Sequence, residues 1–141
     1  MTYYVTGFMY SVDRKHVVLI EKINPKWQRG LLNGVGGKIE KNETPEMAMS
    51  RECEEETGVA TAPEEWKVFS IINRPLKYKV YFLYTLNNNA IHAKTVEEEK
   101  VGIYEVDDLP HNTLYNLKWL IPMGLDPMLS FPHPIQIEET T

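Results

Sequence analysis

The chain has 141 residues, of which 43% are hydrophobic, and this length predicts a single domain over residues 1–141 with a sizeable buried core. Its 15 basic and 20 acidic residues give a formal charge of −5, which disfavours binding to a nucleic-acid polymer. A single cysteine excludes an intrachain disulfide, and no apolar run reaches the roughly 18 residues of a membrane span, so we expect a cytoplasmic protein.

The N-terminal part predicts strands separated by turns. Residues 3–11 and 16–23 are rich in aromatic and β-branched residues, which favours two strands joined as a hairpin. Residues 24–32 predict a loop, and Trp27 within it has two equally supported interpretations: packing on the core or flanking a substrate base. A short strand and a turn are expected at 34–40.

A helix with recognisable ends is predicted after this turn. Thr44 suits the N-cap, Pro45 the first helical position, and Gly58 a left-handed residue that ends the helix. The residues expected to face the core at helical spacing are Met47, Ala48 and Cys53.

The C-terminal part predicts further strands at residues 66–73, 77–86 and 101–106. Residues 113–120 suit a second helix, prolonged past Pro122 as a bent or separate turn to Leu129. The tail after about Phe131 is expected to be poorly ordered at its end. Because strands, helix, strands and helix follow one another, the sequence predicts a layered α+β or α/β domain.

The predicted helix carries a run of acidic residues. Glu52, Glu55 and Glu56 share one face at helical spacing, where like charges destabilise an isolated helix. A divalent cation would offset the repulsion, and Mg²⁺ or Mn²⁺ prefers such oxygen ligands. The alternative is a solvated acidic face, which is the interpretation for Glu54. The glycine-rich segment 33–38 upstream would let the backbone approach a phosphate or a metal closely.

Residues 37–59 resemble the Nudix box, G-x5-E-x7-R-E-U-x-E-E-x-G-U, in which U is a bulky aliphatic residue. The only departure is Cys53 at the first U position, a packing change on the buried side of the helix. The charged and glycine positions that match are Gly37, Glu43, Arg51, Glu52, Glu55, Glu56 and Gly58.

This resemblance implies an α/β/α sandwich around a mixed β-sheet and a hydrolase of pyrophosphate bonds. It implies Glu55 and Glu56 as the principal Mg²⁺ ligands, with Mn²⁺ as a substitute. Glu52 would lie at the metal or near the activated water, and the carbonyl of Gly36 would be a further ligand. Gly37 and Gly58 would be structural.

Other charged residues have two interpretations each. A bidentate pair between Arg51 and Glu43 would lock the loop against the helix, and this structural role is favoured over direct catalysis. Lys38 would meet a phosphate as a point charge, or be an ordinary exposed lysine. Residues 97–99 form a second acidic run. This run is either solvated surface or, as the resemblance implies, it supplies one carboxylate, Glu98 or Glu99, that reaches the metals.

The substrate is indicated less strongly. The segment before the box is similar to that of MutT-like enzymes, in which the residue matching Asn33 contacts a purine base, although an asparagine here would equally satisfy loop backbone. Tyr115 or Trp119 would stack on the base. Leu117 and Lys118 stand where oxidised-purine enzymes of this kind carry an acidic pair, which argues against that specificity.

The leading hypothesis is a Mg²⁺-dependent hydrolase, a monomer or homodimer, that converts a (deoxy)nucleoside triphosphate, an oxidised purine nucleotide included, to the monophosphate and pyrophosphate. One alternative is a substrate in which a nucleoside diphosphate is linked to another moiety, such as ADP-ribose or a sugar nucleotide; the position of Pro75 is a weak argument for it. Another is a non-catalytic nucleotide sensor. The complete set of carboxylates argues against a sensor, because pure binding does not require three repelling glutamates.

Overall fold

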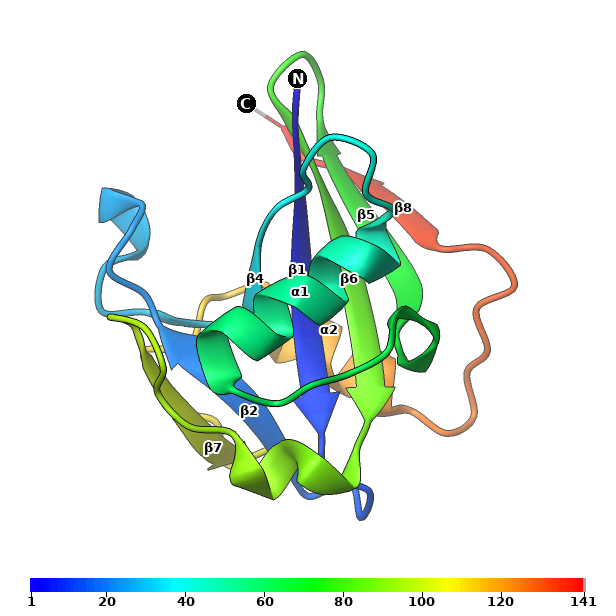
Figure 1. Ribbon diagram of the computed structural model, residues 1–141. Helices are drawn as coiled ribbons and strands as arrows, with labels where there is room; N and C mark the ends of the chain where they lie inside the picture. Colours follow the sequence, from blue (N-terminus) through cyan, green and yellow to red (C-terminus); the bar gives the residue numbers. More distant parts are fainter. Residues whose placement is uncertain (141) are drawn as a thin grey trace.

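A computed structural model describes residues 1–140, in which a β-sheet lies between two helices (Figure 1). The strands are β1 (Thr2–Tyr10), β2 (His16–Glu21), β3 (Leu32–Asn33), β4 (Val35–Lys38), β5 (Lys67–Arg74), β6 (Tyr78–Leu86), β7 (Lys100–Glu105) and β8 (Ile135–Glu138). The helices are α1 (Pro45–Thr57) and α2 (Leu117–Leu125), and short 3-10 turns form η1 (Lys26–Gln28), η2 (Pro63–Glu65) and η3 (Asn88–His92). Within residues 1–140, no helix is both long and apolar enough to cross a membrane.

The sheet is mixed and is built around β1. Its strand order is β3-β2-β1-β6-β5-β8, with β4 also pairing with β1 and β7 with β2. β1 and β6 are parallel, whereas β1 pairs antiparallel with β2 only at Met9 and Tyr10. The preceding part of β1, from Tyr4 to Gly7, pairs antiparallel with β4. The glycine-rich strand is therefore held beside the centre of the sheet, directly before α1.

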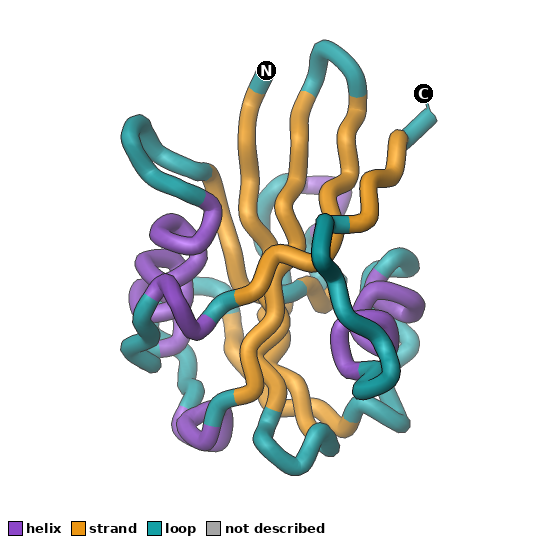
Figure 2. Tube along the Cα trace, turned by 90° about the vertical axis from the view of Figure 1, so that its right-hand side faces the viewer, coloured by secondary structure: helices purple, strands orange, loops and turns teal. Residues whose placement is uncertain are grey.

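The two helices cover opposite faces of the sheet, as the edge-on view shows (Figure 2). Met49 and Cys53 of α1 pack in one apolar cluster with Val5 of β1. Leu120 of α2 packs in the other cluster with Phe8. Because successive side chains of a strand point to opposite faces, β1 supplies both cores. The predicted α/β/α sandwich with a mixed sheet is confirmed.

The ends of α1 follow the sequence signals. The Thr44 hydroxyl accepts a hydrogen bond from Met47 N–H at 3.1 Å, and Gly58 ends the helix in the left-handed region with φ of 78°. The prediction that Met47 faces the core is wrong, because its side chain is 45% exposed. Met49 is buried in its place, as are the other two predicted residues.

The cap at Thr44 provides a test of what begins this helix. Replacement of Thr44 by alanine is expected to lower the free energy of unfolding by about 1 kcal/mol, because the N–H of Met47 loses its acceptor. Thr44→Ser keeps the hydroxyl and should retain most of that stability in urea unfolding. Equal losses in both variants would show that the hydroxyl is not the cause.

Two C-terminal elements differ from the sequence prediction. α2 begins at Leu117, not at residue 113, because the backbone of residues 112 and 114 hydrogen-bonds to Leu32 instead of forming a helical turn. The tail after Phe131 contains a strand that the sequence did not predict, at residues 135–138. They form β8, which pairs in parallel with β5, and Ile137 packs against the α2-side core.

Candidate active site

The close approach of β4 to α1 brings two glycines against two carboxylates. The N–H of Gly36 donates a hydrogen bond to Glu56 Oε1 at 2.9 Å. A Cβ at Gly37 would lie 2.7 Å from the carboxylate atoms of Glu52, and one at Gly36 would lie 1.9 Å from the carbonyl oxygen of Val5. A side chain at Gly37 would therefore displace the Glu52 carboxylate of α1, and one at Gly36 would push β4 away from β1.

Glu56 lies in an unfavourable environment for its own charge. Glu56 is only 8% exposed, and burial raises the pKa of its carboxyl to about 8. The negative charges of Glu52 and Glu99 act in the same direction, whereas the Gly36 N–H and Lys22 lower the pKa. A cation beside Glu56 would stabilise the ionised form.

Glu52 is influenced by the same cluster. Burial is the largest cause that raises its pKa, and the hydrogen bond from Arg51 opposes this effect. The charges of Glu55 and Glu97 raise it further, so both side chains contribute to the negative field at Glu52. The acidic helix face and the acidic run before β7 therefore form one electrostatic unit.

Arg51 joins the loop before the helix to the helix itself. Its Nε lies 2.7 Å from Glu43 Oε2 and its Nη2 lies 2.9 Å from Oε1, which is the bidentate pair expected from the sequence. Nη2 also donates to the carbonyl of Lys38 at 3.0 Å. Nη1 donates to Glu52 at 2.8 Å and to Glu55 at 3.4 Å. The hydrogen bond to Arg51 lowers the pKa of Glu43.

The acidic run before β7 divides into three environments. Glu97 is exposed and adds to the field at Glu52. Glu98 is exposed, and within residues 1–140 its side chain forms no hydrogen bond or ion pair. Glu99 is partly buried and pairs with Lys22 at 3.1 Å. Its carboxylate also accepts hydrogen bonds from the backbone N–H groups of the two residues that follow this lysine.

Asn33 and Tyr115 come from segments that lie side by side. Leu32, next to Asn33, forms a parallel bridge with Thr113. Asn33 Oδ1 accepts from the following N–H at 2.7 Å, and its Nδ2 donates to Gln28 Oε1 at 3.1 Å. The Asn33 amide is therefore engaged within the loop, as the structural interpretation of this residue expects.

The remaining predicted substrate residues are at the surface. Tyr115 is 78% exposed, and Lys118 Nζ lies 5.6 Å from the centre of its ring. Trp119 is 37% exposed on α2, and the side chain of Lys38 is exposed at the end of β4. Trp27 of η1 is 70% exposed, so it does not pack in the core. Aromatic surface is thus available on the two loops beside β3.

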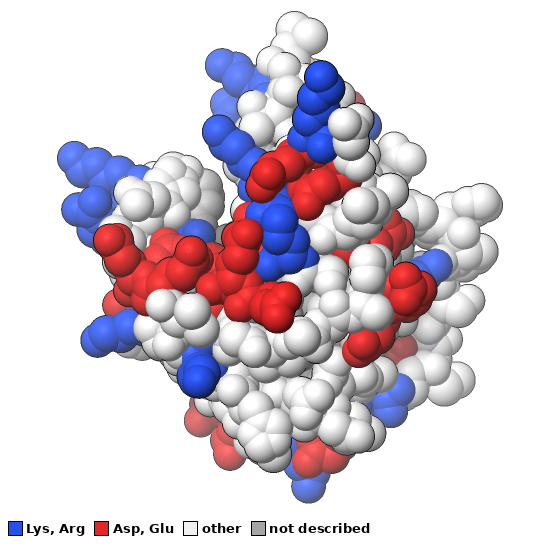
Figure 3. Space-filling view, in the orientation of Figure 1, with Lys and Arg blue, Asp and Glu red and all other residues white. Residues whose placement is uncertain are grey.

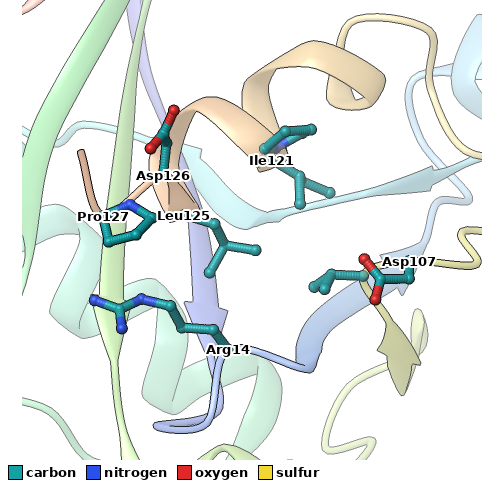
Figure 4. Close-up of a pocket in the computed structure, with 8 residues that line it drawn as sticks. Arg14, Asp107, Ile121, Leu125, Asp126 and Pro127 are labelled. Carbon is teal, nitrogen blue, oxygen red and sulfur yellow. The ribbon is translucent and has the colours of Figure 1, made fainter. Parts of the chain in front are cut away.

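The molecular surface shows where these groups meet. Acidic side chains gather over α1 and the segment before β7, and this acidic surface reaches the base of the lobe that carries η1, beside a notch at the left of Figure 3. Basic side chains lie on that lobe and above the notch. A separate hollow of about 390 Å³ lies between α2 and the β1–β2 turn, where Arg14 and Asp107 line it (Figure 4). None of the predicted site residues lines this hollow.

The donor set fits a hard divalent cation. Glu52, Glu55, Glu56 and the carbonyl of Gly36 offer only oxygen atoms, which Mg²⁺ prefers. Within residues 1–140, no group of three or more acidic, histidine or cysteine side chains is already gathered at ligand spacing. In this arrangement the guanidinium of Arg51 donates hydrogen bonds to two of these carboxylates, those of Glu52 and Glu55. The burial of Glu56 is the observation that matches a cation. Its carboxylate accepts one hydrogen bond, and the positive charge of Lys22 does not prevent burial and the charges of Glu52 and Glu99 from raising its pKa.

Sequence reasoning missed Lys22 and Glu40, and within the acidic run it favoured Glu98 or Glu99 over Glu97. Lys22 acts on Glu56 and pairs with Glu99, Glu97 acts on Glu52, and Glu40 lies 3.3 Å from Arg51. The Lys22–Glu99 pair spans 77 positions and depends on the register of β2 with β7, which no local pattern reveals. Glu40 was detectable in principle, because it lies in the same loop as Glu43.

A comparison with family models assigns the class of this protein. The NUDIX domain model matches residues 3–121, and the chain belongs to this family. It is therefore a Nudix hydrolase, a pyrophosphohydrolase, and the family is typically dependent on a divalent metal. No curated protein sequence matches the chain.

Solved structures agree on the fold. One comes from work on MutT of Aliivibrio salmonicida and Vibrio cholerae, with a TM-score of 0.72, 20% identity, and coverage of 91% of this chain and 98% of that one. A MutT protein from Bacillus halodurans has a TM-score of 0.68, 16% identity, and coverage of 99% and 91%. A MutT/nudix family protein from Enterococcus faecalis has a TM-score of 0.60 and 19% identity, over 74% of this chain and 43% of that one. At these identities the likeness concerns the fold.

Proposed function

We propose that this Nudix hydrolase cleaves a (deoxy)nucleoside triphosphate to the monophosphate and pyrophosphate with Mg²⁺. The observation that carries the proposal is the Glu56 carboxyl, which is buried against Gly36 and has a pKa raised to about 8 by burial. An ionised carboxyl that is buried among other carboxyls destabilises the fold unless a cation neutralises it. A nucleotide polyphosphate also needs its charge neutralised before water can attack.

The acidic face of α1 would hold the ion. Glu52, Glu55, Glu56 and the Gly36 carbonyl are the proposed ligands, with Mn²⁺ as a substitute for Mg²⁺. When bound, the ion shields phosphoryl oxygens and makes water a better nucleophile. The other steps belong to the protein. Arg51 holds one oxygen of Glu52 at 2.8 Å, which orients this side chain.

Proton removal from the attacking water is assigned to a carboxylate. Glu52 or a member of the acidic run before β7, Glu98 or Glu99 in the sequence-based proposal, accepts this proton. The geometry favours Glu52 over Glu99, because both Glu99 oxygens already accept hydrogen bonds from Lys22 and the neighbouring backbone. Glu97 is an added candidate, because its charge acts on Glu52.

The base end of the substrate is assigned to the loops beside β3. The exposed ring of Tyr115 offers a stacking surface, and Trp119 offers a second one on α2. Asn33 would read the base by exchanging its hydrogen bond with Gln28 for one with the substrate. Lys38, exposed at the end of β4, would meet a phosphate.

The substrate class is tested by phosphate and pyrophosphate release from a nucleotide panel with Mg²⁺. Release of pyrophosphate from nucleoside triphosphates, with the monophosphate as second product, is the expected result. Turnover confined to ADP-ribose or sugar nucleotides would replace the proposed substrate class by linked diphosphates. Binding without turnover of any nucleotide would indicate a sensor. Including 8-oxo-dGTP beside dGTP in the panel tests the oxidised-purine specificity directly.

The role of Glu55 is tested on the best substrate of that panel. Glu55→Gln removes a negative charge from the half-exposed end of the acidic face but keeps the size of the side chain. We expect kcat to fall by about 10²-fold and the Mg²⁺ concentration for half-maximal rate to rise. Glu54→Gln, on an exposed neighbouring position, is the matched control. Near-wild-type kinetics of Glu55→Gln would remove this residue from the proposed ligand set.

A further inference from the structure

One carboxylate binds three consecutive residues at the start of the loop between β2 and β3. Glu99 Oε1 accepts a hydrogen bond from Lys22 Nζ at 3.1 Å. Glu99 Oε2 accepts from the backbone N–H groups of Ile23 at 2.6 Å and Asn24 at 3.3 Å. The antiparallel pairing of β7 with β2 brings Glu99 to this position. Hydrogen bonds to an ionised acceptor are stronger than neutral ones, so this is a firm attachment between distant segments.

The loop that Glu99 holds, residues 23–31, has little apolar anchoring of its own. η1 within it buries no residue, and the loop is closed at its base by hydrogen bonds. Gly30 N–H donates to the carbonyl of Lys22 at 2.8 Å, and Lys22 N–H donates to the carbonyl of Leu31 at 2.9 Å. Segments held by polar contacts at the surface open more easily than segments packed in a core. The contacts of Glu99 hold one end of this loop, and a hydrogen bond from Asn112 Nδ2 to the carbonyl of Gly30 at 3.0 Å holds the other.

This loop connects the two ends of the candidate active site. In Figure 3 the lobe that carries it forms one side of the notch beside the acidic surface. At one end, Lys22 and Glu99 both act on the charge of Glu56. At the other end, Gln28 Oε1 accepts a hydrogen bond from Asn33 Nδ2 at 3.1 Å.

We propose that Glu99 is a positioning residue, which fixes the loop of residues 23–31 as a preformed wall of the nucleotide site and acts through this loop instead of binding the metal. The inference rests on the proposed function, because it assigns the notch to the nucleotide. A wall that is ordered before the substrate arrives spares the ordering entropy at binding. Loss of the contacts that hold this loop therefore weakens substrate binding more than it slows the chemical step.

Kinetics of a Glu99→Ala variant separate the two roles. Glu105→Ala is the matched control, because Glu105 is an exposed carboxylate at the far end of the same strand. Positioning predicts a KM raised by about tenfold, with kcat and the Mg²⁺ dependence within about threefold of wild type. Glu99→Gln keeps an acceptor oxygen for the backbone N–H groups, so it should recover part of the loss. A fall of kcat by about 100-fold together with a weakened response to Mg²⁺ would overturn the proposal and make Glu99 a ligand.

Amide hydrogen exchange tests the attachment without any substrate. In Glu99→Ala, the amides of residues 23–31 should exchange faster than in wild type, whereas in Glu105→Ala they should be unchanged. Equal exchange in all three proteins would overturn the proposal. Faster exchange in Glu99→Ala with an unchanged KM would also overturn the proposal, because the loop would then not line the nucleotide site.

Failure of the proposed function is distinguishable from failure of this inference. Absence of turnover by the wild-type protein on every nucleotide would refute the proposed reaction. The Kd of a non-hydrolysable triphosphate analogue then replaces KM, and the same tenfold weakening in Glu99→Ala is expected. A Kd unchanged by the substitution would overturn the positioning role alone.

Discussion

Replacement of Glu56 by glutamine is expected to lower kcat by about 10³-fold with little change in the fold, because it removes a charge from the centre of the proposed metal site. The amide oxygen of the variant still accepts the Gly36 hydrogen bond, which in wild type spans 2.9 Å. Steady-state kinetics with Mg²⁺ and circular dichroism provide the measurement. A variant with more than about a tenth of the wild-type kcat would contradict the proposed ligand role of Glu56.

The same substitution should change how stability depends on pH. In the folded metal-free protein, the Glu56 carboxyl has its pKa raised from 4.5 to about 8, so between these pH values the folded state keeps a proton that the unfolded state has released. The contribution of this group is therefore fully present below about pH 4.5 and is lost as the pH rises to 8, by up to about 1.4 kcal/mol per pH unit.

Unfolding in urea at several pH values, with a chelator present, isolates this effect. As the pH rises, the unfolding free energy of wild type should fall relative to that of Glu56→Gln, since glutamine does not titrate. Mg²⁺ should reduce the slope, because a bound cation favours the ionised carboxylate. A difference that stays constant from pH 5 to pH 8 would show that burial does not raise this pKa.

Replacement of Arg51 by alanine is expected to have the largest effect on stability, a loss of about 3 kcal/mol. The side chain of Arg51 is 24% exposed, and those of Glu43 and Glu52 are 14% and 15% exposed, so removal of the guanidinium leaves two sheltered carboxylates without their partner. Thermal or urea unfolding measures the loss. Arg51→Lys keeps the charge without the bidentate geometry, and its stability should lie between that of wild type and that of Arg51→Ala.

A double-mutant cycle identifies the pair that matters most. Arg51→Ala and Glu43→Gln remove the two partners of the bidentate bond, so their effects should be strongly non-additive. Additive losses would mean that the pair contributes little and that Arg51 stabilises the protein through Glu52. Mg²⁺ should restore part of the stability of Arg51→Ala, because both the cation and the guanidinium compensate the carboxylates on α1.

The parts of the site that lie close together in the sequence were predictable. Thr44 and Gly58 delimit α1 by local backbone chemistry, and the Arg51–Glu43 pair joins two positions only eight residues apart, one in the loop before α1 and one in the helix. The three carboxylates on one helix face follow from helical geometry alone. Each of these features depends on fewer than about a dozen consecutive residues, so no knowledge of the sheet was needed.

The features that depend on strand register were not predictable. Glu99 binds residues 22–24 only because β7 lies antiparallel to β2, and the local sequence did not distinguish Glu98 from Glu99. The same limit applies to α2 and to β8. Backbone hydrogen bonds with Leu32 move the start of α2 to a later residue, and β8 forms because β5 offers an open edge of the sheet. Burial of Glu56 is likewise a property of the packed fold, although its charge pattern is local.

The parallel pairing of β1 with β6 has a consequence for how the protein folds during its synthesis. Every residue of β1 pairs with one that is 76 positions later in the chain, from Thr2 with Tyr78 to Tyr10 with Leu86. β1 thus leaves the ribosome well before β6, the strand with which it pairs in parallel, and long-range parallel pairing is slow. Until Leu86 has emerged, β1 lacks the strand with which it pairs along its whole length. The nascent chain therefore passes through a stage at which chaperones or aggregation compete with folding.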